Sequence, residues 1–260
     1  MSQTSFPFSL EQTKRLVFAL DSAVGRLVNV AGEIGIREPR GDVWFTLLKQ
    51  KLLPQISEES LMVVAVVGGT NTGKSLLFNQ LAGENASSVD ARAAGTKHPV
   101  CILPLPRKSG DGTQKQQSPE DLIRRYFKDF TPVQWSGAEQ PLESSDTNLL
   151  FWRVGSNVPE RLMLLDTPDI DSDAEVNWER ASAIRQAADI LFAVVTPQKY
   201  NDAAVRRFFR DATAAGKQTI LMWNMVDIEQ DASDLPQWTE QFSRETGTQP
   251  HAVYVAPHNR

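Results

Sequence analysis

The chain has 260 residues, 41% of them hydrophobic and 23% charged, with a net charge of -5 and a single cysteine. One cysteine excludes a disulfide framework and fits a reducing compartment, and an acidic chain without blocks of like charge disfavours nucleic-acid binding through bulk electrostatics. No apolar run reaches the roughly 18 to 20 residues of a membrane span, and the N-terminus lacks the basic and apolar regions of a signal peptide.

The N-terminal segment, residues 1–58, predicts a helical hairpin. Residues 9–32 carry apolar side chains every three or four positions, which is the pattern of an amphipathic helix. The stretch "REPRGD" interrupts that pattern, and residues 42–53 predict a second helix that ends at Pro54. Two interpretations stay open, a packing appendage and a lever or self-assembly element.

Residues 59–260 predict a separate α/β domain, because short apolar runs alternate there with helical stretches. Strands buried on both faces and alternating with helices indicate a doubly wound, mostly parallel sheet. The predicted strands are residues 61–67, 98–105, 148–154, 161–166, 189–195, 219–224 and 251–256. The predicted helices are residues 74–82, 118–129, 175–188, 201–215 and 235–246. Residues 106–147 are polar, and we expect a surface insertion there.

The stretch "GGTNTGKS" after the first strand fits the pattern G-x-x-x-x-G-K-[ST] and is called the phosphate loop (residues 68–75) below. Glycines let the backbone curl so that its N–H groups point at phosphate oxygens. Lys74 would bring positive charge to the outer phosphates, and the Ser75 hydroxyl would ligate Mg²⁺. Its place between strand and helix favours a nucleotide site over a chance turn. The predicted contact residues here are Gly68, Gly69, Thr70, Asn71, Thr72, Gly73, Lys74, Ser75 and Leu76.

Two further stretches could complete a magnesium and phosphate site. In "DTPD", at the end of a predicted strand, Asp166 would support the Mg²⁺ and the turn at Asp169 would sense the outermost phosphate. In "GTKHP", Thr96 could place its hydroxyl on the metal and its N–H on the γ-phosphate, which would make this segment a switch. The alternative for Thr96 is a plain residue at the entry to a strand.

The stretch "NMVD", which begins at Asn224, predicts a base-reading loop (residues 224–227). The Asp227 carboxylate could accept hydrogen bonds from the ring N–H and the exocyclic amine of guanine. Adenine offers no such pair, so an unpaired buried carboxylate would select against it. The alternative is that Asn224 and Asp227 merely form a turn.

Taken in order, "GGTNTGKS", "GTKHP", "DTPD" and "NMVD" resemble the signature of P-loop GTPases, and more narrowly that of bacterial dynamin-like and Era-like GTPases, over about residues 61–256. The resemblance implies a six-stranded sheet with helices on both faces. It implies Mg²⁺-dependent hydrolysis of GTP to GDP and phosphate, slow without a partner or self-association through the G domain. The implied roles are catalysis by Lys74, Thr96 and Asn71, metal binding by Ser75, Thr96 and Asp166, and nucleotide contacts from the phosphate loop, Asp166, Asp169, Asn224 and Asp227.

The family's G domain normally has a helix after its last strand, so we expect this domain to continue past residue 260. In dynamin-like relatives such a region often meets membrane. The resemblance therefore implies a cytoplasmic location, and the full-length protein could lie at the periphery of the inner membrane.

Three positions depart from the family pattern: Met225 replaces a lysine, Asp169 a glycine, and Ile170 a water-orienting glutamine. Asn71 occupies the position that ligates K⁺ in potassium-activated members, which suggests that K⁺ neutralises charge there. The alternative for Asn71 is a turn former. The departures keep two rival functions open, a non-hydrolysing pseudo-GTPase and, less favoured, an ATP-using P-loop enzyme.

Overall fold

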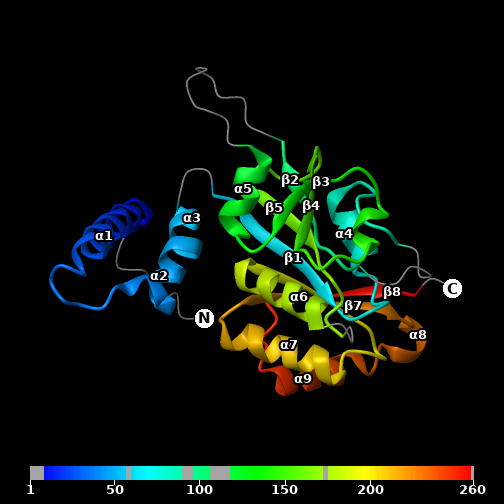
Figure 1. Ribbon diagram of the computed structural model, residues 1–260. Coiled ribbons are helices and arrows are strands. Elements are labelled where there is room, and N and C mark those ends of the chain that lie inside the picture. The colour runs from blue at the N-terminus through cyan, green and yellow to red at the C-terminus, as the bar shows by residue number, and fades with distance from the viewer. Residues whose placement is uncertain (1–8, 57–59, 90–95, 106–117, 172–174, 259–260) are drawn as a thin grey trace. The chain divides into compact units, whose positions relative to one another are not determined.

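The computed structural model describes residues 9–56, 60–89, 96–105, 118–171 and 175–258 (Figure 1). Its contacts divide the chain into two compact units, Met1–Ser60 and Leu61–Arg260. Of the helices within the described ranges, none is both long and apolar enough to cross a membrane.

The first unit contains the predicted pair of helical stretches. Its elements are α1 (Leu10–Val30), η1 (Pro39–Gly41), α2 (Val43–Leu47), η2 (Leu48–Leu52) and α3 (Leu53–Ile56). Ser9 caps α1 in a capping box with Gln12, and Val17 and Val24 of α1 pack against Leu48. The second helical stretch was predicted to end at Pro54, and this is wrong. Helical structure runs without a break from Val43 to Ile56, and the π-helical turn η2 just before Pro54 replaces the regular hydrogen-bond ladder that a proline would interrupt.

The second unit is built on a doubly wound sheet, as predicted, but its described residues form eight strands where the family resemblance implied six. Their order is β3-β4-β2-β5-β1-β6-β7-β8, and every neighbouring pair is parallel except β2 and β5. The two additional strands, β3 and β4, extend the sheet beyond β2. The strands are β1 (Met62–Gly68), β2 (Val100–Pro104), β3 (Thr131–Gln134), β4 (Leu149–Gly155), β5 (Leu162–Asp166), β6 (Ile190–Val195), β7 (Gln218–Val226) and β8 (Ala252–Pro257).

Part of the segment predicted as a surface insertion belongs to the core. Residues 106–117 lie outside the described residues, but α5 (Pro119–Tyr126) packs on the sheet, β3 forms its edge strand next to β4, and η3 (Gln140–Leu142) follows them. Ile123, Phe127 and Phe130 are buried in the main hydrophobic cluster. The surface prediction is wrong for these residues because it judged the mean polarity of the whole segment, whereas three of its apolar side chains are buried in the fold.

Helices cover both faces of the sheet (Figure 1). Along β1, Val63, Ala65 and Val67 join the cluster that includes residues of α5, α6, α7 and α9, whereas Val64 and Val66 join the cluster under α4. The helices are α4 (Lys74–Ala82), α6 (Glu175–Ala187), α7 (Ala203–Ala214), α8 (Ile228–Asp231) and α9 (Leu235–Thr246).

The strand directions bring the predicted site residues to one edge of the sheet. The carboxyl ends of the parallel strands β1, β5, β6 and β7 lie together, which is where open α/β sheets bind ligands. Because β2 runs antiparallel to β5, with Val100 opposite Asp166, the residues before β2 enter at the same edge. Thr96 therefore lies near Asp166 at the end of β5, although the two residues are 70 positions apart in the sequence.

Candidate nucleotide-binding site

The phosphate loop has a backbone shape that depends on its glycines. Gly73 has a φ of 91°, and Asn71 at the exposed tip has a φ of 58°, both in the left-handed region. A Cβ at Gly73 would collide with the Asn224 amide, and one at Gly68 with the Val194 carbonyl oxygen. Glycine is therefore required at both ends of the loop, and the chain can curl there before α4 begins at Lys74.

Lys74 lies almost fully buried beneath the phosphate loop, with 4% of its surface exposed. Its Nζ donates a hydrogen bond to the Gly69 carbonyl oxygen at 2.8 Å and forms an ion pair with Oδ1 of Asp169. Asp169, only 7% exposed, thus compensates the buried ammonium charge. The pair holds the ammonium group at the loop whose backbone would cradle phosphates.

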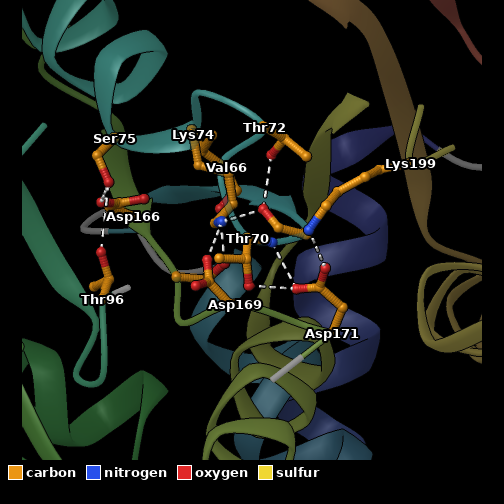
Figure 2. A network of polar contacts seen from close by, with 12 residues as sticks. Val66, Thr70, Thr72, Lys74, Ser75, Thr96, Asp166, Asp169, Asp171 and Lys199 are labelled. Atoms are coloured by element: carbon orange, nitrogen blue, oxygen red, sulfur yellow. Dashed lines mark hydrogen bonds and ion pairs between the residues drawn. The ribbon is translucent and has the colours of Figure 1, made fainter. Parts of the chain in front are cut away.

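Oxygen donors gather where the sequence predicted a metal. The Ser75 hydroxyl donates to Oδ2 of Asp166 at 2.7 Å, and Thr96 Oγ1 lies 3.4 Å from Ser75 Oγ (Figure 2). The Ser87 hydroxyl donates to the same Asp166 oxygen at 2.6 Å. Burial raises the pKa of Asp166, against the opposing effect of the hydrogen bonds from Ser87 and Ser75. Ser87 was not predicted, because nothing in its sequence context distinguishes it from a loop serine.

The residues present fit a Mg²⁺ ion. Oδ1 of Asp166 is buried and has no hydrogen-bond partner within the described part of the chain. A buried carboxylate oxygen without a partner is costly, and a hard cation satisfies it. The hydroxyl groups of Ser75 and Thr96 supply the neutral oxygens that Mg²⁺ accepts beside one carboxylate and nucleotide phosphates.

Arg180 on α6 fixes the segment that follows Thr96. It is 2% exposed, and it donates hydrogen bonds to the carbonyl oxygens of Lys97 (2.9 Å), Ser145 (2.6 Å) and Thr147 (3.0 Å). Burial lowers the pKa of Arg180. Its role was not predicted, because an arginine in an amphipathic helix normally reads as a solvated residue and its partners lie far away in sequence.

A second carboxylate contacts the phosphate loop and was also missed. Asp171 accepts hydrogen bonds from Thr70 N (2.6 Å) and Thr70 Oγ1 (2.7 Å), and its other oxygen lies 3.0 Å from Lys199 Nζ (Figure 2). Burial alone would raise the pKa of Asp171, but the hydrogen bonds from Thr70 and Lys199 lower it overall. Ile170, between the two acids, is buried in the core and does not face this network.

The base-reading loop is shaped by a bulge at the end of β7. The strand register shifts between Trp223 and Val226, and Met225 has a φ of 58°. The bulge lets Asn224 donate its side-chain amide to the Thr72 carbonyl oxygen at 2.8 Å, so Asn224 braces the phosphate loop. Asp227 accepts the backbone N–H groups of the first turn of α8 and caps that helix.

The structure thus gathers most of the predicted residues around one loop. Lys74, Asp169 and Asn224 contact the phosphate loop directly, and Ser75, Thr96 and Asp166 form the oxygen cluster. The Leu76 side chain points away from the core and is 52% exposed. The turn-forming role considered for Asp227 is real, and base recognition by the same carboxylate is a proposal.

Several solved structures resemble the chain. One is Era in complex with MgGDPNP and nucleotides 1506–1542 of 16S ribosomal RNA, with 15% identity, a TM-score of 0.45, and 77% of this chain and 52% of that chain covered. A second is an oligomerised bacterial dynamin pair, with 14% identity, a TM-score of 0.47, and 91% of this chain and 37% of that chain covered. A third is Toc33 from Arabidopsis thaliana, with 16% identity, a TM-score of 0.43, and 82% of this chain and 77% of that chain covered. The chain thus spans about half the length of the Era chain, 52%.

No curated protein matches the chain in sequence. A protein family described as "50S ribosome-binding GTPase" matches residues 63–225, which is more than half of the chain. The matched region contains the phosphate loop, the Thr96 segment, Asp166 and Asn224, and it ends just before Asp227. The chain therefore belongs to this family of P-loop GTPases.

Proposed function

We propose that the chain binds GTP and hydrolyses it to GDP and phosphate with Mg²⁺, as a dynamin-like or Era-like switch. The observation that carries this proposal is the meeting of Lys74, Ser75, Asp166 and Thr96 around one phosphate loop. The start of α4, the end of β5 and the segment before β2 supply these groups, so their meeting is a property of the fold, and each has a use in phosphoryl transfer.

In this proposal the chain stabilises charge on the outer phosphates. Lys74 and the N–H groups of the phosphate loop bind the β- and γ-phosphate oxygens. Ser75, Thr96 and Asp166 would hold Mg²⁺, which would neutralise developing charge on those oxygens. Asp227 reads guanine, while Asn224 keeps the phosphate loop in place.

The group that orients the attacking water is a separate question, because Ile170 is buried in the core. We propose that K⁺ beside Asn71 contributes the missing charge stabilisation, supported by the exposed position of Asn71 at the loop tip. Self-association through the G domain would be a second source. Turnover of the wild type in K⁺ and in Na⁺ tests the first idea, and equal rates would contradict it.

The proposed switch depends on Thr96. Thr96 Oγ1 lies 3.4 Å from Ser75 Oγ, so the position of Thr96 would respond to a bound γ-phosphate, whereas Arg180 holds the next residue, Lys97, against α6. A cytoplasmic location, with possible contact at a membrane surface, belongs to the same proposal.

Calorimetric titration of GTP, GDP and ATP into the purified chain, with Mg²⁺ and constant K⁺, tests the proposal. We expect GTP and GDP to bind and ATP to give no heat of binding. Lys74→Met, which keeps the buried stem but removes the charge, should abolish binding of both guanine nucleotides. Equal binding of ATP would overturn guanine recognition by Asp227.

A non-hydrolysing pseudo-GTPase is the second candidate. Asp169 and Met225 replace the residues expected there, and Ile170 is buried in the core and cannot orient water. Release of phosphate from GTP at a rate that Lys74→Met abolishes would exclude this candidate, whereas binding without turnover would establish it.

A further inference from the structure

Two carboxylates from the loop that follows β5 are attached to the anion-binding groups of the phosphate loop. Asp169 pairs with the Lys74 ammonium group, and Asp171 accepts both the backbone N–H and the hydroxyl of Thr70 (Figure 2). Phosphate loops use backbone N–H groups and a lysine to bind phosphate oxygens. The two carboxylates thus accept hydrogen bonds from Lys74 and Thr70, which are donors that the phosphates of a nucleotide would need.

The contact of Asp171 is closely fitted. A Cβ at Gly69 would lie 2.8 Å from Oδ2 of Asp171, so glycine at this position permits the approach. Lys199, from the loop after β6, pairs with that same oxygen from the other side at 3.0 Å. The side chain of Asp171 is 9% exposed, so the carboxylate is shielded from water and its charge acts strongly on neighbouring groups.

We propose that Asp169 and Asp171 are specificity-determining residues that make the site prefer a nucleoside diphosphate over the triphosphate. This inference rests on the proposed function. A triphosphate carries more negative charge than a diphosphate and extends one phosphate further along the loop. It must therefore displace or tolerate both carboxylates, and two buried negative charges beside an added phosphate are repulsive.

Lys199 gives the proposal a test in the opposite direction. Removing the charge of Asp169 or Asp171 relieves the repulsion, whereas removing Lys199 leaves Asp171 charged and less compensated. The first two changes should shift the preference toward triphosphate and the third toward diphosphate. A merely structural role of the network would weaken both ligands alike in all three variants.

The experiment is calorimetric titration of GDP and of GDPNP, a GTP analogue that resists hydrolysis, into the full chain with Mg²⁺. For Asp169→Asn and Asp171→Asn we expect the affinity for GDPNP relative to GDP to rise about tenfold. For Lys199→Met we expect it to fall. Asp129→Asn removes an exposed acid between α5 and β3 and should leave the ratio unchanged.

Thermal unfolding covers the case in which Asp169→Asn is poorly stable, because that change leaves the Lys74 charge without its partner. Without nucleotide this variant should unfold at a lower temperature than the wild type, yet GDPNP should raise its unfolding temperature more than it raises that of the wild type. A ratio that stays constant in all variants, while both ligands bind, would overturn this inference and leave the GTPase proposal standing. Failure of the wild type to bind either nucleotide would instead overturn the GTPase proposal.

Discussion

The carboxylate of Asp227 combines two tasks that can be separated by a conservative change. It caps α8 by accepting the N–H groups of Glu229 and Gln230, and it is proposed to accept the N–H groups of guanine. Asn at this position keeps an oxygen for the cap, but its amide group donates where the carboxylate accepts.

We predict that Asp227→Asn binds GDP at least about tenfold more weakly and gains affinity for xanthosine diphosphate. Xanthine has a carbonyl where guanine has its exocyclic amine, so the Asn amide can donate to it. Titration of both nucleotides measures the change. Unaltered GDP affinity would mean that Asp227 only caps α8.

His98 makes the unfolding free energy depend on pH. It is fully buried, and burial first, then the charge of Arg180, lower its pKa from 6.5 to about 4. Between these values the unfolded chain binds a proton that the folded chain does not, so stability is lost as pH falls from 6.5 toward 4. The full loss is about 3 kcal/mol.

Urea unfolding at pH 7 and pH 5 measures this effect. His98→Gln should show a smaller loss of stability between the two pH values than the wild type shows. His251→Gln, at an exposed histidine, should keep the wild-type difference. Equal pH dependence in His98→Gln and the wild type would show that other groups cause it.

At single positions, the sequence predicted residues whose chemistry has a fixed spacing along the chain. Lys74 and Ser75 follow from the glycine pattern, and Asp166 from its place at a strand end. Asp171 and Arg180 were not predicted because their partners, Thr70 and Lys97, are distant in sequence. Only folding brings each of the two residues next to its partner.

Helix α6 connects the Thr96 segment to the loop before β4, and Arg180 makes that connection. We predict that Arg180→Met lowers the unfolding free energy by about 3 kcal/mol or more, because three backbone carbonyls lose a donor. Arg185→Met, on the same helix, should cost about 1 kcal/mol, since Arg185 pairs with the half-exposed Asp211 and one carbonyl. Urea unfolding of both variants measures the two costs, and equal losses would contradict the special role of Arg180.

Element prediction worked where apolar runs or helical periods were long. The seven predicted strands all exist, and β7 extends two residues past its predicted end because the bulge continues the pairing to Val226. The strand β3 was missed, since "TPVQ" is four residues long and holds a proline, which edge strands tolerate. The count of six strands came from the family resemblance, which carries no information on additions at a sheet edge.

In the whole molecule, the proposed site belongs to one of the two compact units. All residues of the phosphate loop, the oxygen cluster and the base-reading loop lie within Leu61–Arg260. The first unit has its own hydrophobic cluster around Val17, Val24 and Leu48. We therefore expect nucleotide binding to need only the second unit. For the first unit, the two interpretations given above are a packing appendage and a self-assembly element.

We predict that a chain of residues 61–260 binds GDP with an affinity within about twofold of the full chain, because no residue of the site is removed. Titration of GDP measures this, and sedimentation of both chains with GDPNP measures assembly. If the full chain self-associates and the shorter one does not, residues 1–60 are the assembly element. Identical sedimentation would leave them a packing appendage, and a large loss of GDP affinity would contradict the independence of the second unit.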